Sequence, residues 1–544
     1  MKTILQLHCT YCKKTAQEVS RVEVGKELAI TLSCGHLLIK PSLSSLDIDI
    51  TSSDGKKPFH YQITGAKFLE EADCNALCLD EQGLGKTIEE CLLLKRNKDL
   101  LPALIVCKSG LRIQWFLEIL RWTGIASQII VNSKDQPLFE FFPIVIISID
   151  TLRLIRPDIK VQSEWDSILE TRKGKKKNHI PTWTDEVCAR FKHICIDEIQ
   201  KVKNPTASRT QALRKIVSLA NNGQKARVIG LSGTPIDKHA GEFFVALNLI
   251  RPELFPHQST YQLQFCQINP YNGKIGGLKN ADRFRDLTES FIIRRKREEV
   301  LPDLPKVFRQ FRFADLEGDE LAAYIKLVQE FQEFMESEAP KIPLDILGRL
   351  SKLRHITGIA KVSAAVEFIE EFLLSHNRKL VIFLHHKRAA AMLLAKLSTL
   401  CTEGAINQPL VLSSELDVTA RSRVVEEFKR DGNRLLIAST QVAAEGLNLQ
   451  FCSDCLFMER QWNPTIEEQG ESRFPRPGQT ADKINATYLI AAGTVDDFLT
   501  DIVEEKRRHV ASVIDRKETW GDEGSLAVEL AEVIRVKGLK KWSL

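Results

Sequence analysis

The sequence has no long hydrophobic run, no tandem repeat and no long low-complexity tract. No stretch approaches the roughly 18 uninterrupted apolar residues that a transmembrane helix needs. His8 and Cys9 stand where a signal peptide would place its apolar core. We therefore expect a protein that has neither a membrane anchor nor a secretory signal.

The chain also lacks an excess of one charge, since 76 Lys and Arg residues against 71 Asp and Glu residues leave a net charge of only +5. Such a balance does not by itself indicate a polyanionic partner. The 13 cysteines are odd in number and spread over 544 residues, which favours free thiols or a metal site in a reducing compartment over disulfide bonds. With 43% hydrophobic and 27% charged residues the chain is typical of globular proteins, and its length predicts about three or four domains.

Short apolar runs recur in two groups, separated by stretches that are typical of helices. They lie at 103–107, 144–148, 193–196 and 227–231, and then at 380–384, 410–412, 435–438, 455–458 and 484–490. This is the pattern of buried parallel strands joined by crossover helices. We therefore predict an α/β fold with two parallel-sheet lobes. The predicted domains are an N-terminal module at 1–45, lobes at 46–236 and 375–495, helical insertions and an inter-lobe linker at 237–374, and a C-terminal helical brace at 496–544.

A phosphate-binding loop is predicted at 80–87, DEQGLGKT, between an apolar run and a helical stretch. Gly83 and Gly85 let the backbone approach a phosphate group closely. Lys86 can reach the β and γ phosphates, and Thr87 can hold Mg²⁺. A glycine turn exposed to solvent is the alternative interpretation.

Two adjacent carboxylates, Asp197 and Glu198, follow the apolar run at 193–196. Ligands of open α/β sheets bind at the carboxyl ends of the parallel strands. Asp197 can support the Mg²⁺ on a nucleotide, and Glu198 can position or deprotonate an attacking water. On their own they would more often be a helix-capping pair, but together with Lys86 they predict a nucleotide-hydrolysing site.

Near the N-terminus, Cys9 and Cys12 are followed by Cys34 and His36. Four soft ligands in two close pairs suit tetrahedral Zn²⁺ and leave no open position for catalysis. They predict a small zinc-ribbon-like module that the metal stabilises and that docks DNA or a partner. Unrelated thiols are the alternative.

Over about residues 59–516 the sequence resembles the SWI/SNF-type ATPases of helicase superfamily two. The matching segments lie at 59–65, 80–87, 104–115, 147–153, 232–235, 250–255, 293–306, 439–449, 462–464 and 469–479. The segments IRPELF and IRRKREEVLPDLPK, at 250–255 and 293–306, are found in SWI/SNF-type motors and not in helicases at large. The stretch at 352–362 looks more like the smaller annealing-helicase-like or bacterial members.

The resemblance implies two RecA-like lobes that close on ATP and Mg²⁺. By its motifs, Gln62 would contact the adenine, and Arg473 and Arg476 would face the nucleotide from the second lobe. A guanidinium in that position stabilises charge on the transferred phosphoryl group and is worth about a thousandfold or more in rate. A surface salt bridge is the alternative for either arginine. Gln200 replaces a residue that is usually His in the family and can still form a hydrogen bond.

A motor of this family must hold DNA phosphates without reading sequence. The candidate contacts in the matched motifs are Lys108, Ser109, Arg112, Ser439, Thr440 and Asn448. The basic cluster at 294–297 is a further candidate, while the basic run at 172–177 is a solvated loop, an additional DNA contact or a localisation signal. Trp115 and Trp462 are expected to be core aromatics rather than base-stacking platforms.

We therefore predict an ATP-dependent double-stranded DNA translocase that displaces DNA-bound proteins, RNA polymerase among the candidates, without conventional strand separation and without a membrane partner. The alternatives are a superfamily-two helicase that unwinds RNA or DNA and a non-hydrolysing DNA-binding scaffold. The expected location is the cytoplasm of a prokaryote or virus-infected host, in association with the nucleoid, or the nucleus in a eukaryote.

Overall fold

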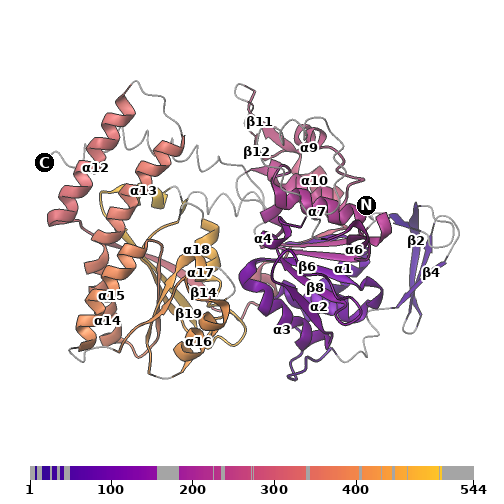
Figure 1. Cartoon of the computed structure of the whole chain (residues 1–544), viewed down its shortest axis with the longest axis horizontal. Helices are drawn as coiled ribbons and strands as arrows, with labels where there is room; N and C mark the ends of the chain where they lie inside the picture. Colours follow the sequence, from indigo (N-terminus) through magenta and orange to yellow (C-terminus); the bar gives the residue numbers. More distant parts are fainter. Residues whose placement is uncertain are drawn as a thin grey trace. The chain divides into compact units, whose positions relative to one another are not determined.

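The structure is a computed structural model in which the chain forms two compact units (Figure 1). The described residues are 6–8, 15–24, 27–32, 37–41, 50–155, 183–224, 226–233, 239–270, 273, 275–337, 343–402, 407–430, 432–443, 447–461, 464–501 and 503–504. The first unit comprises Met1–Pro235, Phe243–Gln258 and Asn280–Lys296, and the second comprises Ile236–Glu242, Ser259–Lys279 and Arg297–Leu544.

The first unit is built on a seven-stranded sheet in which every pair of neighbouring strands is parallel. In spatial order the strands are β13 (Ile292–Ile293), β5 (Ala76–Cys78), β10 (Arg227–Leu231), β9 (His193–Asp197), β6 (Ala103–Cys107), β8 (Ile144–Ser148) and β7 (Ser127–Ile130). The inner strands are apolar almost throughout because helices cover both faces of such a sheet. The predicted parallel sheet of the first lobe is confirmed.

Helices of the first unit form two groups. Helices α1 (His60–Glu71), α2 (Lys86–Arg96) and α3 (Arg112–Thr123) pack side by side, and α4 (Ile149–Leu152) and α6 (Asp185–Ala189) both contact α7 (Ser208–Leu219). Right-handed crossovers from β5 toward β7 and back place these two groups on opposite faces of the sheet. Helices α8 (Phe244–Ile250) and α10 (Ala281–Thr288) complete the unit, and α9 (Gln258–Phe265) spans its boundary with the second unit.

The second unit contains a six-stranded parallel sheet, as predicted for the second lobe. Its spatial order is β14 (Lys306–Ala314), β19 (Lys483–Ala491), β18 (Asp454–Phe457), β15 (Leu380–Leu384), β17 (Leu435–Ser439) and β16 (Leu410–Leu412). Alternate residues of β15 enter two different cores: Leu380, Ile382 and Leu384 pack with α14 and α15, while Val381 and Phe383 pack on the other face. The period of two along a strand explains why one continuous apolar run serves both faces.

The helices of the second unit follow from the same crossovers. α14 (Val362–Ser375) and α15 (Lys387–Thr402) contact each other over one core, whereas residues of α16 (Val418–Lys429) and α17 (Thr440–Ala443) pack in the other, and α17 contacts α18 (Pro464–Glu471). Helices α12 (Gly318–Glu336) and α13 (Pro343–Ala360) share a third cluster with the end of β19, and the short α11 (Arg297–Val300) precedes β14. Within the described residues no helix has the length and apolarity needed to span a bilayer.

The segment 237–374, predicted as helical insertions and an inter-lobe linker, contains helices and also strands that the sequence did not indicate: β13, β14 and a hairpin of β11 (Cys266–Ile268) and β12 (Ile275–Leu278). β14 was missed because it is an edge strand whose side chains are largely exposed, so Arg309, Gln310 and Arg312 interrupt its phenylalanines and it has no continuous apolar run. β13 has only two residues, too few for any periodicity to be visible.

The N-terminal segment forms a four-stranded antiparallel sheet in the order β1 (Gln6–His8), β2 (Thr15–Val24), β3 (Glu27–Leu32) and β4 (Leu37–Pro41). The four candidate zinc ligands, Cys9, Cys12, Cys34 and His36, lie outside the described residues.

Candidate active site

Three motifs meet at the carboxyl ends of three neighbouring strands of the first unit. Cys78 at the end of β5 is in register with Leu231 of β10, which is in register with Asp197 of β9. The backbone N–H of Ser232 donates to the carbonyl of Cys78 at 3.0 Å. This edge is where open parallel sheets bind ligands. The phosphate-loop motif and the carboxylate motif meet there, as predicted from their positions after strands, and Ser232 of the matching segment 232–235 follows the strand between them.

The phosphate-loop motif connects β5 to α2, and Lys86 is the first residue of the helix. Gly83 and Gly85 have φ values of 89° and 82°, in the left-handed region that glycine adopts readily. A Cβ at Gly85 would lie 2.4 Å from Nε2 of Gln62, and one at Gly233 would lie 2.4 Å from Cγ of Gln82. Glycine is therefore required at Gly85 both by the backbone conformation and by the close approach of Gln62.

Lys86 and Gln62 both hydrogen-bond to the backbone of this loop. Nζ of Lys86 donates to the carbonyls of Asp80 at 2.7 Å and Glu81 at 3.3 Å. Nε2 of Gln62 donates to the carbonyl of Leu84 at 2.9 Å, and its Oε1 accepts from the N–H of Phe59 at 3.0 Å. The assignments of Lys86 and Thr87 to phosphate and Mg²⁺, and of Gln62 to adenine, stay predictions.

A buried ion network connects the start of the phosphate loop to the neighbouring helices. Asp80 and Glu89 are both fully buried, and the guanidinium of Arg295 bonds both carboxylates: Nε lies 2.9 Å from Oδ2 of Asp80, and one terminal nitrogen lies 2.6 Å from Oε1 of Glu89. The same guanidinium donates to the carbonyl of Tyr61. Arg295 thus ties α1, α2 and the start of the loop together.

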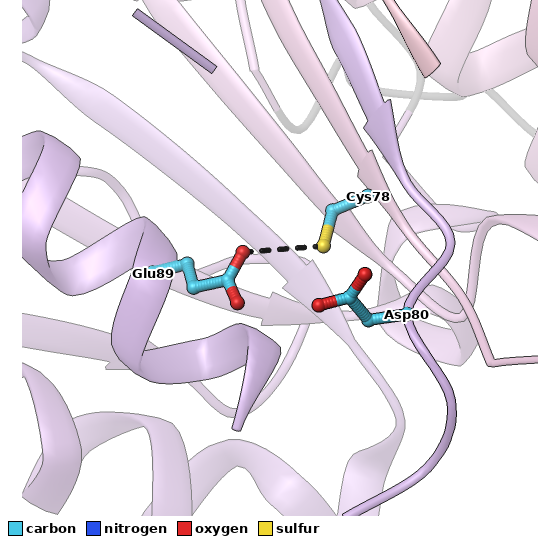
Figure 2. A group of neighbouring side chains, drawn as sticks. All are labelled: Cys78, Asp80 and Glu89. Atoms are coloured by element: carbon cyan, nitrogen blue, oxygen red, sulfur yellow. Dashed lines mark hydrogen bonds between the residues drawn. The ribbon is translucent and has the colours of Figure 1, made fainter. Parts of the chain in front are cut away.

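Figure 2 shows Cys78 and Asp80 next to each other, both facing Glu89 of α2, and the thiol of Cys78 donates to Oε2 of Glu89 at 3.4 Å. These three side chains are close enough together to hold a metal ion. However, Arg295 already supplies the cation to both carboxylates, and burial raises the pKa of the Cys78 thiol well above its usual value. Burial and the charge of Asp80 raise the pKa of Glu89 to about 8, while Arg295 opposes them. The cluster is therefore an ion network in which the pKa of Glu89 lies well above the usual range of a carboxyl group.

The position of Arg295 contradicts its predicted role as a contact for DNA phosphates. The basic cluster at 294–297 was a candidate for phosphate contact, but the side chain of Arg295 is only 14% exposed and points into the network. For Arg295 that prediction is wrong, because two buried carboxylates require a compensating cation.

Asp197 and Glu198 have different surroundings. Asp197 ends β9, and its Oδ2 accepts from Nε1 of the buried Trp115 at 2.9 Å. Burial and the charge of Glu198 raise the pKa of Asp197 to about 6. Trp115 is therefore a core aromatic, as expected, with an additional hydrogen bond to the predicted magnesium ligand.

Glu198 has φ of 55° and ψ of 53°, in the left-handed region, at the start of the short helix Ile199–Val202. Its Oε1 lies 3.6 Å from Nζ of Lys108, and its Oε2 accepts from Nε2 of Gln200. Burial acts to raise the pKa of Glu198, but Lys108, Gln200 and Lys86 outweigh it and the pKa is lowered. Glu198 is therefore charged at neutral pH, as a base for water must be.

In the second unit the two candidate arginines follow α18. The carbonyl of Arg473 accepts from the N–H of Leu449 at 3.1 Å, and Nε of Arg476 donates to the carbonyl of Ser472 at 3.2 Å. Burial and the nearby cations Arg473 and Arg297 lower the pKa of Arg476. Clustered cations of this kind favour an anion, but contact with a nucleotide stays a prediction.

The remaining candidate DNA contacts differ in accessibility. Ser109 and Asn448 are exposed and Ser439 is half-buried, while Arg112 donates to the carbonyls of Ser109 and Ile130. Thr440 is fully buried and its hydroxyl donates to the carbonyl of Leu384 at 3.0 Å. The prediction of a DNA contact is therefore wrong for the side chain of Thr440, whose hydroxyl links the start of α17 to the end of β15. Thr234, Pro235, Trp462 and Asn463 of the matched motifs lie outside the described residues.

Sequence comparison assigns the family. The model of the SNF2-related domain matches residues 61–359, more than half of the chain. The chain belongs to the SNF2-related family. The model of the helicase conserved C-terminal domain matches residues 360–478. This SNF2-related chain is therefore a helicase-like ATPase, and the resemblance noted from its motifs is confirmed.

Named relatives include annealing helicases. The mouse DNA annealing helicase and endonuclease ZRANB3 is 27% identical over 85% of this chain and 42% of that protein. The SWI/SNF-related matrix-associated actin-dependent regulator of chromatin subfamily A-like protein 1 of Xenopus laevis is 27% identical over 85% of this chain and 45% of that protein. The uncharacterized ATP-dependent helicase MG018 of Mycoplasma genitalium is 23% identical, over 84% and 42%. The SNF2-related chain thus spans less than half the length of these relatives.

Among solved structures, the Sulfolobus solfataricus SWI2/SNF2 ATPase core in complex with dsDNA is 19% identical with a TM-score of 0.36. The match covers 88% of this chain and 97% of that chain.

Proposed function

We propose that this SNF2-related ATPase is an ATP-dependent translocase on double-stranded DNA, which remodels or displaces protein–DNA complexes without conventional strand separation. The observation that carries the proposal is the meeting of the Lys86 loop, Asp197 and Glu198 at one sheet edge of a chain of this family. The names of its relatives, an annealing helicase and a chromatin regulator, support DNA as the track.

The residues at this edge suit ATP and Mg²⁺. The hydroxyl of Thr87 and the carboxylate of Asp197 are hard oxygen donors, the type that Mg²⁺ prefers, and Mg²⁺ supplies charge neutralisation on the phosphate oxygens. Lys86 would leave the loop carbonyls to pair with the phosphates. Trp115 orients Asp197 through its indole N–H, and the charged Glu198 would accept a proton from the attacking water. Arg473 and Arg476 would stabilise the charge that develops on the transferred group.

We extend the proposal to a structural Zn²⁺ held by Cys9, Cys12, Cys34 and His36. In an antiparallel sheet of order β1-β2-β3-β4, the connections β1–β2 and β3–β4 leave the same end of the sheet, which favours two ligand pairs facing one ion. The test is the zinc content of the purified protein. One equivalent that is lost in Cys9→Ser supports the site, and less than a tenth of an equivalent in the unaltered chain contradicts it.

The function is tested by steady-state ATP turnover of the purified chain with no nucleic acid, single-stranded DNA, duplex DNA and RNA. Stimulation by duplex DNA that is lost in Lys86→Ala, followed by displacement of a triplex-forming strand, supports the translocase. Preference for RNA would instead favour a strand-unwinding helicase, and indifference to every nucleic acid would contradict DNA as the track.

A further inference from the structure

Lys108 and Glu198 lie opposite each other on neighbouring strands. β6 and β9 are parallel, and Val106 is in register with Ile196. Lys108 and Glu198 lie two residues further along these strands and therefore face each other near the strand ends. Nζ of Lys108 lies 3.6 Å from Oε1 of Glu198, and the two side chains are 19% and 17% exposed. A residue of the segment predicted to touch DNA is therefore paired with the residue predicted to activate water.

Both oxygens of Glu198 are engaged. Oε1 faces Lys108 and Oε2 accepts from Gln200, while the backbone is held in the left-handed region. The other charged groups that act on this carboxylate are Asp197, Lys86 and Lys201. A general base needs an oxygen within hydrogen-bond reach of the water that it deprotonates. Here the Lys108 cation competes with water for Oε1, and the amide of Gln200 donates to Oε2.

The pair is of the kind that a competing anion can break. Nζ of Lys108 and Oε1 of Glu198 are 3.6 Å apart, which is longer than a charge-assisted hydrogen bond, so the pair is held less tightly than one in direct contact. A DNA phosphate offers Lys108 a full negative charge, and binding to it releases condensed counterions. Lys108 can therefore leave Glu198 for a phosphate at small cost.

We propose that the Lys108–Glu198 ion pair restrains ATP hydrolysis in the DNA-free chain, and that a phosphate of bound duplex DNA takes Lys108 and so releases Glu198 to the attacking water. This proposal rests on the proposed function, which identifies double-stranded DNA as the polymer that the ATPase binds and moves along. It makes Lys108 a positioning residue that links occupancy of the DNA site to the water-activating carboxylate.

The test compares the full-length chain with Lys108→Ala, Lys108→Gln and Lys108→Arg. Lys192→Ala is the matched control, because Lys192 is exposed on the same unit and directly precedes β9, at the opposite end of that strand. DNA-free kcat should rise about two- to fivefold in the Ala and Gln variants, the range expected for release of a weak ion pair. The ratio of DNA-stimulated to DNA-free kcat should fall by at least the same factor, and Lys108→Arg should restore both.

Rescue by Lys108→Arg and the salt dependence of DNA binding separate this role from a structural one, because a purely structural role would not raise DNA-free kcat when the charge of Lys108 is removed. The salt dependence of duplex binding should also weaken by about one phosphate contact.

An unchanged or reduced DNA-free kcat in both Lys108→Ala and Lys108→Gln overturns the proposal, since Lys108 would then not restrain Glu198. Lys108→Gln keeps most of the side chain, so it decides the matter if the Ala variant is poorly folded. If duplex DNA fails to stimulate the unaltered chain, the proposed function fails instead, and the restraint is still decided by the DNA-free rates.

Discussion

Replacing Arg295 by Met should destabilise the first unit more than any exposed substitution. The change leaves Asp80 and Glu89, both fully buried, without their cation. Removal of one partner from a buried ion pair typically costs about 3–5 kcal/mol. The effect should be local, because Arg295 follows β13. The carbonyl of Phe291, directly before β13, accepts from the N–H of Leu77 at 2.8 Å, and the carbonyl of Ile293 accepts from the N–H of Leu79 at 2.7 Å.

Hydrogen exchange at Leu77 and Leu79 measures this loss directly. A cost of that size corresponds to a fall in amide protection of about two to four orders of magnitude. Glu89→Gln is the matched variant, since it mimics the protonated carboxyl that a pKa of about 8 implies and should cost little at pH 7. If Arg295→Met changes protection by less than about tenfold, or if Glu89→Gln is equally costly, the account of the network is refuted.

The same network predicts a pH dependence. The pKa of Glu89 is raised from 4.5 to about 8 in the folded chain, so the folded state binds an extra proton between these values. Its contribution to stability is complete below about pH 4.5 and declines as pH rises, by about 1.4 kcal/mol per pH unit, until about pH 8. Urea unfolding of the first unit should show this decline in the unaltered chain and a flatter curve in Glu89→Gln; parallel curves would contradict it.

Three further substitutions have expected outcomes. Gly65→Ala should lower the free energy of unfolding by about 1–3 kcal/mol through overpacking, because its Cβ would lie 2.2 Å from Oε2 of the fixed Glu89. Gly348→Ala, which meets nothing within 4 Å in helix α13, should raise it by about 0.5–1 kcal/mol in the same urea titration, and equal effects would refute the steric argument. Trp115→Phe removes the hydrogen bond to Asp197 and should raise the Mg²⁺ concentration needed for half-maximal turnover about tenfold or more, since a bond to a charged group is worth about 1.5–3 kcal/mol. An unchanged Mg²⁺ dependence would show that the indole does not orient this carboxylate.

The sequence was sufficient to predict what depends on local pattern. The inner strands of both sheets are buried on two faces and so appear as apolar runs, and the phosphate-loop motif and the Asp197–Glu198 pair each follow such a run directly. Strand β14 was not predicted because an exposed edge strand has no continuous apolar run.

Contacts that depend on spatial order could not be predicted. Arg295 is 215 residues from Asp80, and nothing in its basic neighbourhood distinguishes a buried arginine from one on the surface. The pairing of Lys108 with Glu198 requires β6 to lie beside β9. The periodicity of apolar residues predicts where strands are, but it does not predict their order in the sheet.

The nucleotide-binding unit cannot be prepared as one continuous N-terminal fragment that ends at its last active-site motif. The first unit is assembled from three separate stretches, and the last of them, Asn280–Lys296, carries β13 and Arg295. A fragment that ends at Pro235 would contain every residue of the predicted phosphate-binding loop and the carboxylate pair, yet it would leave Asp80 and Glu89 buried without a cation and β5 without its outer neighbour. The minimal expressible nucleotide-binding fragment therefore extends to at least Lys296.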